Sequence, residues 1–163
     1  MPKFETKRRV RHSAAEMFDL VADVETYPEF VPLCERLHVR TRKIMDDGRE
    51  ILVADMTVAY GPFRESFTSK VTLDRPGMKV LVEYLDGPFR HLENVWTFTA
   101  LGPRTAEIDF FISYEFRSRT LGALMGAMFD RAFRRFAEAF EARADALYGT
   151  GTRAEGPRIG PAA

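Results

Sequence analysis

With 163 residues, the chain is long enough for one folded domain and short for two of ordinary size. Hydrophobic residues make up 45% of it and aromatic residues 12%, with 14 Phe against 5 Tyr and 1 Trp, which predicts a bulky core with few polar handles. Because 24 basic residues balance 24 acidic ones, the net charge is zero. That balance disfavours a protein whose main task is the electrostatic binding of DNA, RNA or anionic lipid.

The single cysteine excludes an intramolecular disulfide and is typical of a reducing compartment. No apolar run approaches the roughly 20 residues that span a bilayer, and MPKFETKRRV lacks the apolar core of a signal peptide. We therefore expect a cytoplasmic protein, with peripheral contact at the inner membrane as a further expectation. The folded domain is expected over 1–148, and the tail over 149–163, rich in Gly, Pro and Ala, is expected to be disordered.

The N-terminal part predicts one strand followed by one short helix. KFETKRRVR, residues 3–11, alternates as a strand does, and its basic run is expected to form a solvated face. Ser13 and Glu16 have the spacing of a capping box. The apolar stripe behind this box predicts a helix of about three turns over 14–24.

The period of the hydrophobic pattern changes to two between Cys34 and Arg117. Six strand-like stretches follow one another there, separated by turn signals rich in Gly, Pro and Asp. Connections this short predict an antiparallel meander, since a parallel crossover needs a dozen or more residues. Each stretch has one apolar face, so the sheet presents a large apolar surface that another element must cover.

The cover is predicted to be one long helix over 120–148, with apolar side chains on one face and charged ones on the other. At ~1.5 Å per residue it is about 40 Å long, enough to cross a curved sheet, and Gly149 stands where a C-cap belongs. Arg143 falls in the apolar stripe, where its stem is expected to pack while its head reaches water beyond the sheet. The predicted class is α+β: a curved antiparallel sheet wrapped around a long C-terminal helix, with two short helices after the first strand, the helix-grip fold.

Catalytic and metal-binding motifs are missing from the sequence. His12, His38 and His91 fall on separate predicted elements, and no HxH, HExxH or CxxC spacing supports a metal site. There is also no GxSxG, P-loop or GxGxxG motif. We therefore expect no catalytic residue, no metal and no catalytic cofactor.

Three further side chains leave chemistry open. Cys34 acts as a nucleophile only with a histidine beside it in space, and a lone cysteine next to prolines is more typical of a small packed hydrophobe. Glu65 and Asn94 share the parity of the apolar residues in their strands, which allows a buried acid. A register shift of one residue, or a bulge, instead turns each of them outward.

Two glycines in the predicted long helix indicate either close packing or free space. Gly122 and Gly126 each cost about 1 kcal/mol relative to Ala in a helix interior. One interpretation is that they let the helix backbone approach the sheet. The other is that they leave room for a guest, with flexible Met125 and Met128 beside them as adaptable walls of an apolar cavity.

The segment YPEFVPLC, Tyr27 to Cys34, is unusually apolar for a connection between a helix and a strand. Pro28 and Pro32 restrict it to short helical turns. If the sheet and the long helix form two walls of a cavity, this segment closes one end as a stiff lid. Ordinary capping of the core is the other interpretation.

Four stretches together resemble one protein family: YPEFVPLC, GPFRESFTSKVTL, the strand around Trp96-Thr97-Phe98, and the ending FISYEFRSRTLGALM with AFEARADALYG. They resemble, in the same order and over about 4–149, the coenzyme Q-binding branch of the START-like, polyketide cyclase/dehydrase superfamily. The resemblance implies a helix-grip protein that binds ubiquinone or a related polyprenyl lipid, supports respiratory electron transfer and is not itself an enzyme. One departure is Leu37, where a small residue is expected three positions after the cysteine.

The expected ligand contacts combine this resemblance with the apolar faces of the lid, the sheet and the long helix. They are Tyr27, Phe30, Val31, Leu33, Met56, Tyr60, Phe67, Trp96, Phe98, Phe110, Tyr114, Met125, Met128, Phe129 and Phe133. A quinone head group needs only a few polar partners, and Tyr60, Tyr114, Asn94 and Trp96 are the candidates. Transient contact with a membrane or a respiratory complex is the expected partnership.

Two alternative functions stay open. The same branch includes ribosome association toxins, and a ribosome-binding surface would use the arginines Arg8, Arg9, Arg11, Arg131, Arg134 and Arg135. Acids interleave with the helical arginines, so electrostatic affinity for RNA is not favoured. A polyketide cyclase or dehydratase is suggested by superfamily analogy alone.

Overall fold

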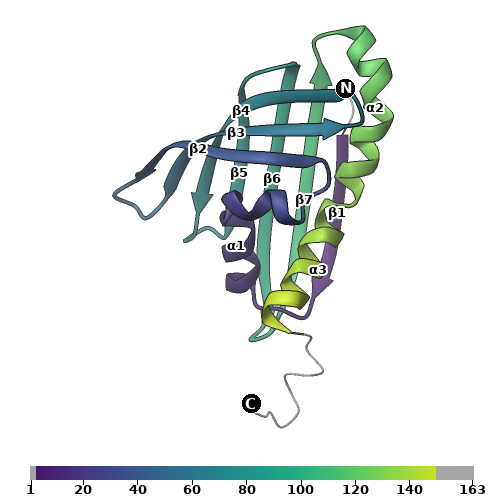
Figure 1. Cartoon of the computed structure of the whole chain (residues 1–163). Coiled ribbons are helices and arrows are strands. Elements are labelled where there is room, and N and C mark those ends of the chain that lie inside the picture. Colours follow the sequence, from purple (N-terminus) through teal and green to yellow (C-terminus); the bar gives the residue numbers. More distant parts are fainter. Residues whose placement is uncertain (1–2, 150–163) are drawn as a thin grey trace.

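The computed structural model of the chain describes residues 3–149 and has one antiparallel sheet with helices on one of its faces (Figure 1). In chain order the elements are β1 Lys3–Val10, α1 Ala14–Ala22, the 3₁₀ helix η1 Val24–Glu29, β2 Cys34–Ile44, β3 Glu50–Tyr60, β4 Phe63–Asp74, β5 Lys79–Asp86, β6 Phe89–Gly102, β7 Thr105–Phe116, α2 Arg119–Arg134 and α3 Phe136–Tyr148. The predicted α+β helix-grip class is confirmed. Apart from Gly149, the tail expected over 149–163 lies outside the described residues.

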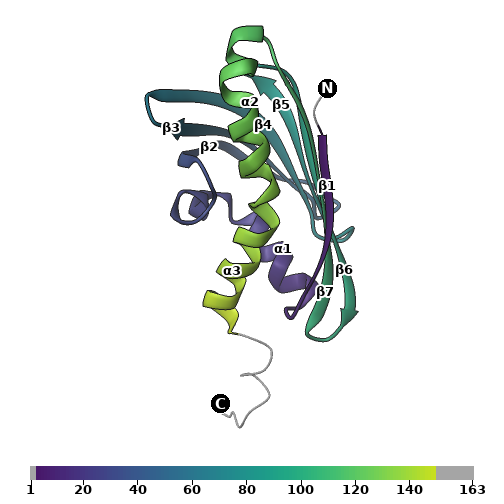
Figure 2. The ribbon, with the colours of Figure 1, turned by 90° about the vertical axis from the view of Figure 1, so that its right-hand side faces the viewer.

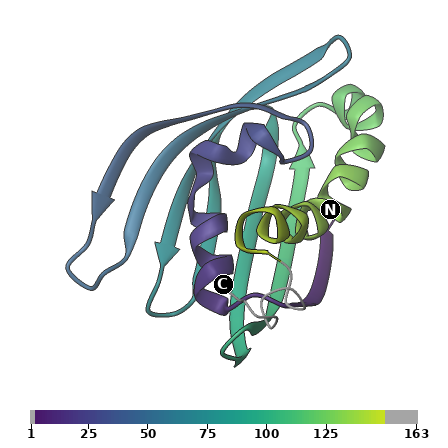
Figure 3. The same ribbon diagram turned by 60° about the horizontal axis from the view of Figure 1, so that its bottom comes forward.

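The sheet has the spatial order β1-β7-β6-β5-β4-β3-β2, and every neighbouring pair is antiparallel. The predicted six-strand meander is therefore β2 to β7, while β1 pairs with β7 at the far edge. The sheet curves, and α2 and α3 run across its hollow side (Figure 2). Seen from below, α1 and η1 lie on that same side, facing α3 (Figure 3). The core is therefore enclosed between one sheet face and the helices.

The capping box at the start of α1 is present as predicted. The Ser13 hydroxyl accepts a hydrogen bond from the Glu16 N–H at 3.0 Å, and the Glu16 carboxylate accepts one from the Ser13 N–H at 3.0 Å. The helix ends at Ala22 rather than Val24, because the chain tightens there into η1, a 3₁₀ helix that contains Pro28. The short helical turns expected around the prolines are thus η1 and the turn after it.

The prediction of one unbroken helix over 120–148 was wrong. The chain forms α2 and α3, separated at Arg135, whose N–H donates to the Ala132 carbonyl in a tight turn at 3.0 Å. After this turn α3 changes direction toward α1, so the pair follows the curvature of the sheet (Figure 1). Gly149 ends α3 as predicted, at a φ of 82° that favours glycine, with its N–H on the Asp145 carbonyl. Over residues 3–149, no helix is long and apolar enough to cross a membrane.

Candidate functional site: an apolar cavity

A cavity of about 90 Å³ lies between the sheet, the helices α2 and α3, and the lid, the name used here for residues 24–33. The lid, the strands β2 to β7 and both C-terminal helices all contribute to its wall. Within residues 3–149, no charged side chain lines it. Typical ligand pockets measure roughly 300–1,000 Å³, so a ligand larger than a few atoms enters only if these walls move apart.

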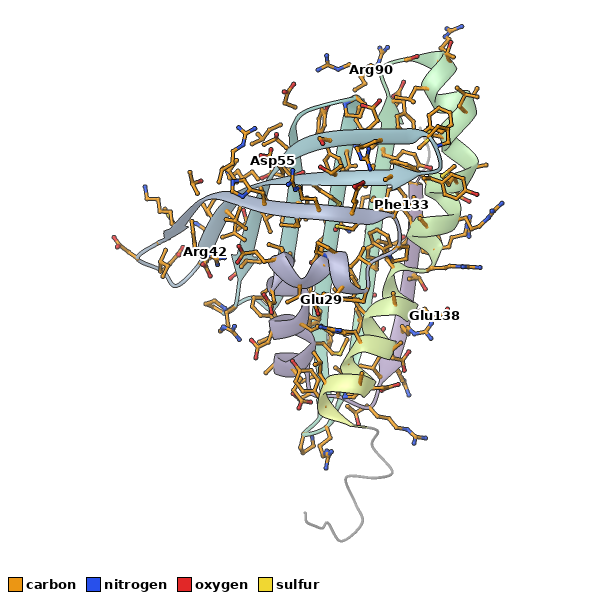
Figure 4. All side chains as sticks on the ribbon, in the orientation of Figure 1. Glu29, Arg42, Asp55, Arg90, Phe133 and Glu138 are labelled. Atoms are coloured by element: carbon orange, nitrogen blue, oxygen red, sulfur yellow. The ribbon has the colours of Figure 1, made fainter. Side chains whose placement is uncertain are left out.

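The structure brings about half of the expected contact residues to this cavity. Those that line it are Tyr27, Leu33, Met56, Phe67, Trp96, Phe129 and Phe133. Phe133 is labelled in Figure 4, where it lies between α2 and the sheet. These seven side chains come from the lid, three strands and α2, so the three predicted walls meet around one space.

The remaining expected contacts do not line the cavity. They are Phe30, Val31, Tyr60, Phe98, Phe110, Tyr114, Met125 and Met128. Tyr60 is 51% exposed at the end of β3, and Phe98 packs instead against Phe18 of α1. Phe110 packs against Phe4 of β1. Phe98, Phe110 and Tyr114 are buried, so alternation assigned them to the core face, but the cavity occupies only part of that face.

Apart from Asn94, which the sequence offered as a partner for the head group, the rest of the wall was not among the expected contacts. It consists of Val24, Pro32, Leu37, Ala54, Val58, Ser69, Val71, Val82, Phe89, Leu92, Asn94, Ile112, Ala132, Phe136 and Phe140. Leu37, the departure from the family pattern, points into the cavity from β2. The period-two pattern of the strands carried the signal for most of the others, since Ala54, Val71 and Leu92 share the inward parity of their neighbours.

Aromatic contacts press the lid against α3. The rings of Tyr27 and Phe30 meet the ring of Phe140 edge-on, with centroids 5.2 Å and 4.9 Å away. The Tyr27 hydroxyl donates to the Val21 carbonyl at 2.5 Å. Burial raises the pKa of Tyr27 above its ordinary value, with smaller contributions from Cys34 and Asp23. The Tyr27 hydroxyl is therefore neutral, and its hydrogen bond joins the lid to the end of α1.

The lid ends in a strained residue that is tied to the sheet. Leu33 has a φ of 67°, in the left-handed region that disfavours side chains. Its carbonyl accepts a hydrogen bond from the Ala59 N–H of β3 at 3.0 Å. This end of the lid is therefore tied to β3.

An ion pair joins η1 to α3. The Arg143 guanidinium donates to the Glu29 carboxylate at 2.5 Å and lies over the Phe30 ring, 5.1 Å from its centroid. The stem of Arg143 packs as expected, and its side chain is still 24% exposed, but its head is paired with the exposed Glu29 instead of standing alone in water. Glu29 is labelled in Figure 4.

In the part of the chain that the structure describes, no histidine contacts Cys34. Its buried thiol meets the Arg36 carbonyl at 3.7 Å, and burial raises its pKa to about 11. His12 instead pairs with Asp145 at 2.7 Å, and His91 contacts Ser113 at 3.0 Å. The arrangement gives Cys34 no base, and among residues 3–149 no group of three side chains could hold a metal.

We expect Cys34 to react slowly with iodoacetamide in the native protein. Only the thiolate reacts, and a pKa of about 11 instead of 9.0 lowers its fraction at pH 7.5, by roughly 100-fold. The labelling rate should rise about tenfold per pH unit toward pH 11, and should become fast at pH 7.5 after unfolding in urea. Rapid native labelling at pH 7.5 would show that the thiol is activated.

The polar side chains Asn94 and Glu65 have different positions. Asn94 is 9% exposed and lines the cavity, where it donates to the Phe111 carbonyl at 2.9 Å and accepts from the Trp96 indole N–H at 3.0 Å. Glu65 shares the inward parity but is only half-buried and does not reach the cavity. The buried acid that the sequence allowed is thus absent from this wall.

The two helix glycines, Gly122 and Gly126, neither bring the helix backbone unusually close to the sheet nor leave room for a guest in the cavity. A Cβ at Gly122 would meet Phe116 at an ordinary 3.8 Å, and a Cβ at Gly126 would meet nothing within 4 Å. Neither glycine lines the cavity, and neither do the neighbouring Met125 and Met128. Close packing does not explain Gly126.

Two of the six surface arginines considered for RNA binding are engaged with acids. Arg8 donates to Glu141, and Arg134 donates to Asp130 at 2.9 Å while lying over the Phe4 ring. The other four, Arg9, Arg11, Arg131 and Arg135, are exposed.

Comparison with known proteins places this architecture in a family. Residues 10–141 match the family described as polyketide cyclase / dehydrase and lipid transport, and the chain belongs to that family. The Ribosome association toxin RatA of Pseudomonas aeruginosa is 33% identical over 138 residues, which are 85% of this chain and 92% of the relative. Coenzyme Q-binding protein COQ10 homolog B, mitochondrial, of Xenopus laevis is 33% identical over 141 residues, 84% of this chain and 55% of the relative.

Solved structures agree with this assignment. An 18 kDa protein from Caulobacter crescentus is 30% identical with a TM-score of 0.74, and the match covers 92% of this chain and all of that one. The Zhui aromatase/cyclase from Streptomyces has a TM-score of 0.73 at 17% identity, covering 90% and 95% of the two chains. At that identity the likeness concerns the fold alone.

Proposed function

We propose that the protein binds a polyprenyl quinone of the ubiquinone type in the cavity and carries it without transforming it. The observation that carries the proposal is the cavity wall, which is rich in aromatic rings and contains no charged side chain. Burial of apolar surface contributes about 25 cal/mol per Å², so an isoprenoid tail supplies affinity without any catalytic group. The coenzyme Q-binding relatives support the same ligand class.

The single tryptophan provides a direct test of this proposal. Trp96 is the only tryptophan in the chain and lines the cavity, and quinones quench indole fluorescence. Titration with a short-chain ubiquinone should quench it saturably at one quinone per protein. A Trp96→Phe variant has no tryptophan signal, so its binding of the same quinone is measured by calorimetry. Heat from this variant at the same stoichiometry verifies that the quenching in the wild type reports binding. No saturable quenching and no heat in the wild-type protein would contradict the proposal.

A cavity of about 90 Å³ is too small for a quinone, so binding requires an opening step, and we expect the lid to provide it. A Glu29→Gln variant loses the charge that pairs with Arg143, so the closed lid is stabilised less. Since this pair is partly exposed, quinone association and dissociation should both accelerate by a few-fold, up to about fivefold, in stopped-flow quenching of Trp96. Glu25→Gln is the matched control, because Glu25 lies on the same short helix and faces Arg42. Equal rates in both variants would show that the ligand enters elsewhere.

Binding to a ribosomal subunit is the second candidate function. It is favoured by the relatives named ribosome association toxin, because the matches to them cover 90% or more of their length. Co-sedimentation with purified large subunits at physiological salt tests it, with the six arginines replaced in groups. We give less weight to a cyclase or dehydratase, since no acid or histidine lines the cavity.

A further inference from the structure

The floor of the cavity has one position where two small residues face each other. Ala54 of β3 lies directly opposite Ser69 of β4, and both side chains line the cavity. The flanking inward pairs are larger: Met56 opposite Phe67, and Leu52 opposite Val71. The pair Ala54 and Ser69 therefore forms a shallow depression in an otherwise bulky surface.

The Ser69 hydroxyl in this depression is buried and has no hydrogen-bond partner. The side chain is 5% exposed, and its Oγ meets no donor or acceptor in the described residues. A buried hydroxyl without a partner lowers stability, and native proteins retain few of them. The Oγ itself has almost no accessible surface, so a guest oxygen reaches it only when the wall moves, which a ligand larger than a few atoms requires in any case.

Each of the other polar groups of the wall already has at least one hydrogen-bond partner. The Tyr27 hydroxyl donates to Val21, and Asn94 and the Trp96 indole bond to each other. Because no charged side chain lines the cavity, a charged head group would be buried without a counter-ion at high cost. The guest must therefore be neutral, and Ser69 is the one polar side chain of the described wall that has no partner at all to compete with it.

We propose that the Ser69 hydroxyl donates a hydrogen bond to a carbonyl oxygen of a neutral lipophilic ligand, whose head group sits in the depression between β3 and β4. This inference rests on the proposed function and adds the ligand's orientation to it. Ser69 selects an oxygen-bearing head group over a hydrocarbon of the same shape, because only the oxygen satisfies the buried hydroxyl.

A Ser69→Ala variant tests the proposal against two ligands, a short-chain ubiquinone and an isoprenoid hydrocarbon that lacks oxygen. The variant should bind the quinone about three- to tenfold more weakly, and it should bind the hydrocarbon, measured by competition, as the wild type does. Its melting temperature without ligand should be unchanged or raised, since an unpaired hydroxyl has been removed. Infrared spectra of bound quinone should show a carbonyl band at lower frequency in the wild type than in the variant.

Ser66→Ala is the matched control, because Ser66 lies on the same strand with its hydroxyl on Thr57 of the outer face, at 2.8 Å. This control should keep the wild-type affinity for both ligands. Equal quinone affinity in Ser69→Ala and the wild type would overturn the inference and leave the proposed function intact. Equal losses for quinone and hydrocarbon would also overturn it, by showing that Ser69 only shapes the cavity. A wild type that binds no quinone would reject the proposed function itself.

Discussion

A Phe136→Asp variant is expected to bind the short-chain ubiquinone about 100-fold more weakly, or not at all, while it keeps the fold. Phe136 is a half-buried residue of the cavity wall and the first residue of α3. A carboxylate there places an uncompensated charge against a lipophilic guest. The same carboxylate is tolerated by the fold, because an acidic side chain in the first turn is favourable for a helix.

The matched control is Leu124→Asp, which adds the same charge to α2 at a side chain that is 55% exposed. It should bind quinone as the wild type does. Affinity is measured by quenching of Trp96, and circular dichroism verifies the fold of both variants. Unimpaired binding in a folded Phe136→Asp protein would show that the ligand does not bind in this cavity.

A Phe89→Ala variant is expected to lose about 3–5 kcal/mol of the free energy of unfolding. Phe89 is 0% exposed, and its ring packs against those of Phe67, Phe116 and Phe129. Its removal leaves a void where β4, β6, β7 and α2 meet. Urea unfolding followed by circular dichroism measures the loss.

Leu85→Ala, on neighbouring β5 and 51% exposed, is the control and should change the free energy of unfolding by less than about 0.5 kcal/mol. If Phe89→Ala is as stable as this control, the packing around the ring does not anchor the wall as described. A cost close to the expected range would identify Phe89 as a main support of the sheet–helix contact.

Local signals in the sequence predicted most of the architecture. The capping box of Ser13 and Glu16 marked the start of α1, and the period-two pattern with turn residues marked β2 to β7. The long apolar stripe predicted the covering helices, and Gly149 their end. These features depend on residues close in sequence, so the sequence alone displays them.

Features that depend on distant residues were missed. The break at Arg135 contains no proline or glycine, and it follows the curvature of a sheet whose shape the helix sequence does not encode. The ion pair of Arg143 with Glu29 was not predicted, because the two residues lie 114 positions apart. In the same way, the unpartnered hydroxyl of Ser69 is visible only once its surroundings are known.

The sequence predicted an apolar cavity, but it did not predict where along the strands the cavity lies. Alternation gave the inward face of each strand, so Met56, Phe67 and Trp96 were named correctly as wall residues. It gave no position along the strand, which is why Phe98 and Tyr60 were included although they lie outside the wall.

The most direct test of the central proposal is to identify what the protein carries in its own cell. The protein is purified from its native host without detergent, extracted with organic solvent, and the extract is examined by mass spectrometry. We expect a polyprenyl quinone in near-stoichiometric amount, and less of it from the Phe136→Asp variant purified alongside. An extract without quinone, from protein that also fails to bind added quinone, would contradict the carrier function.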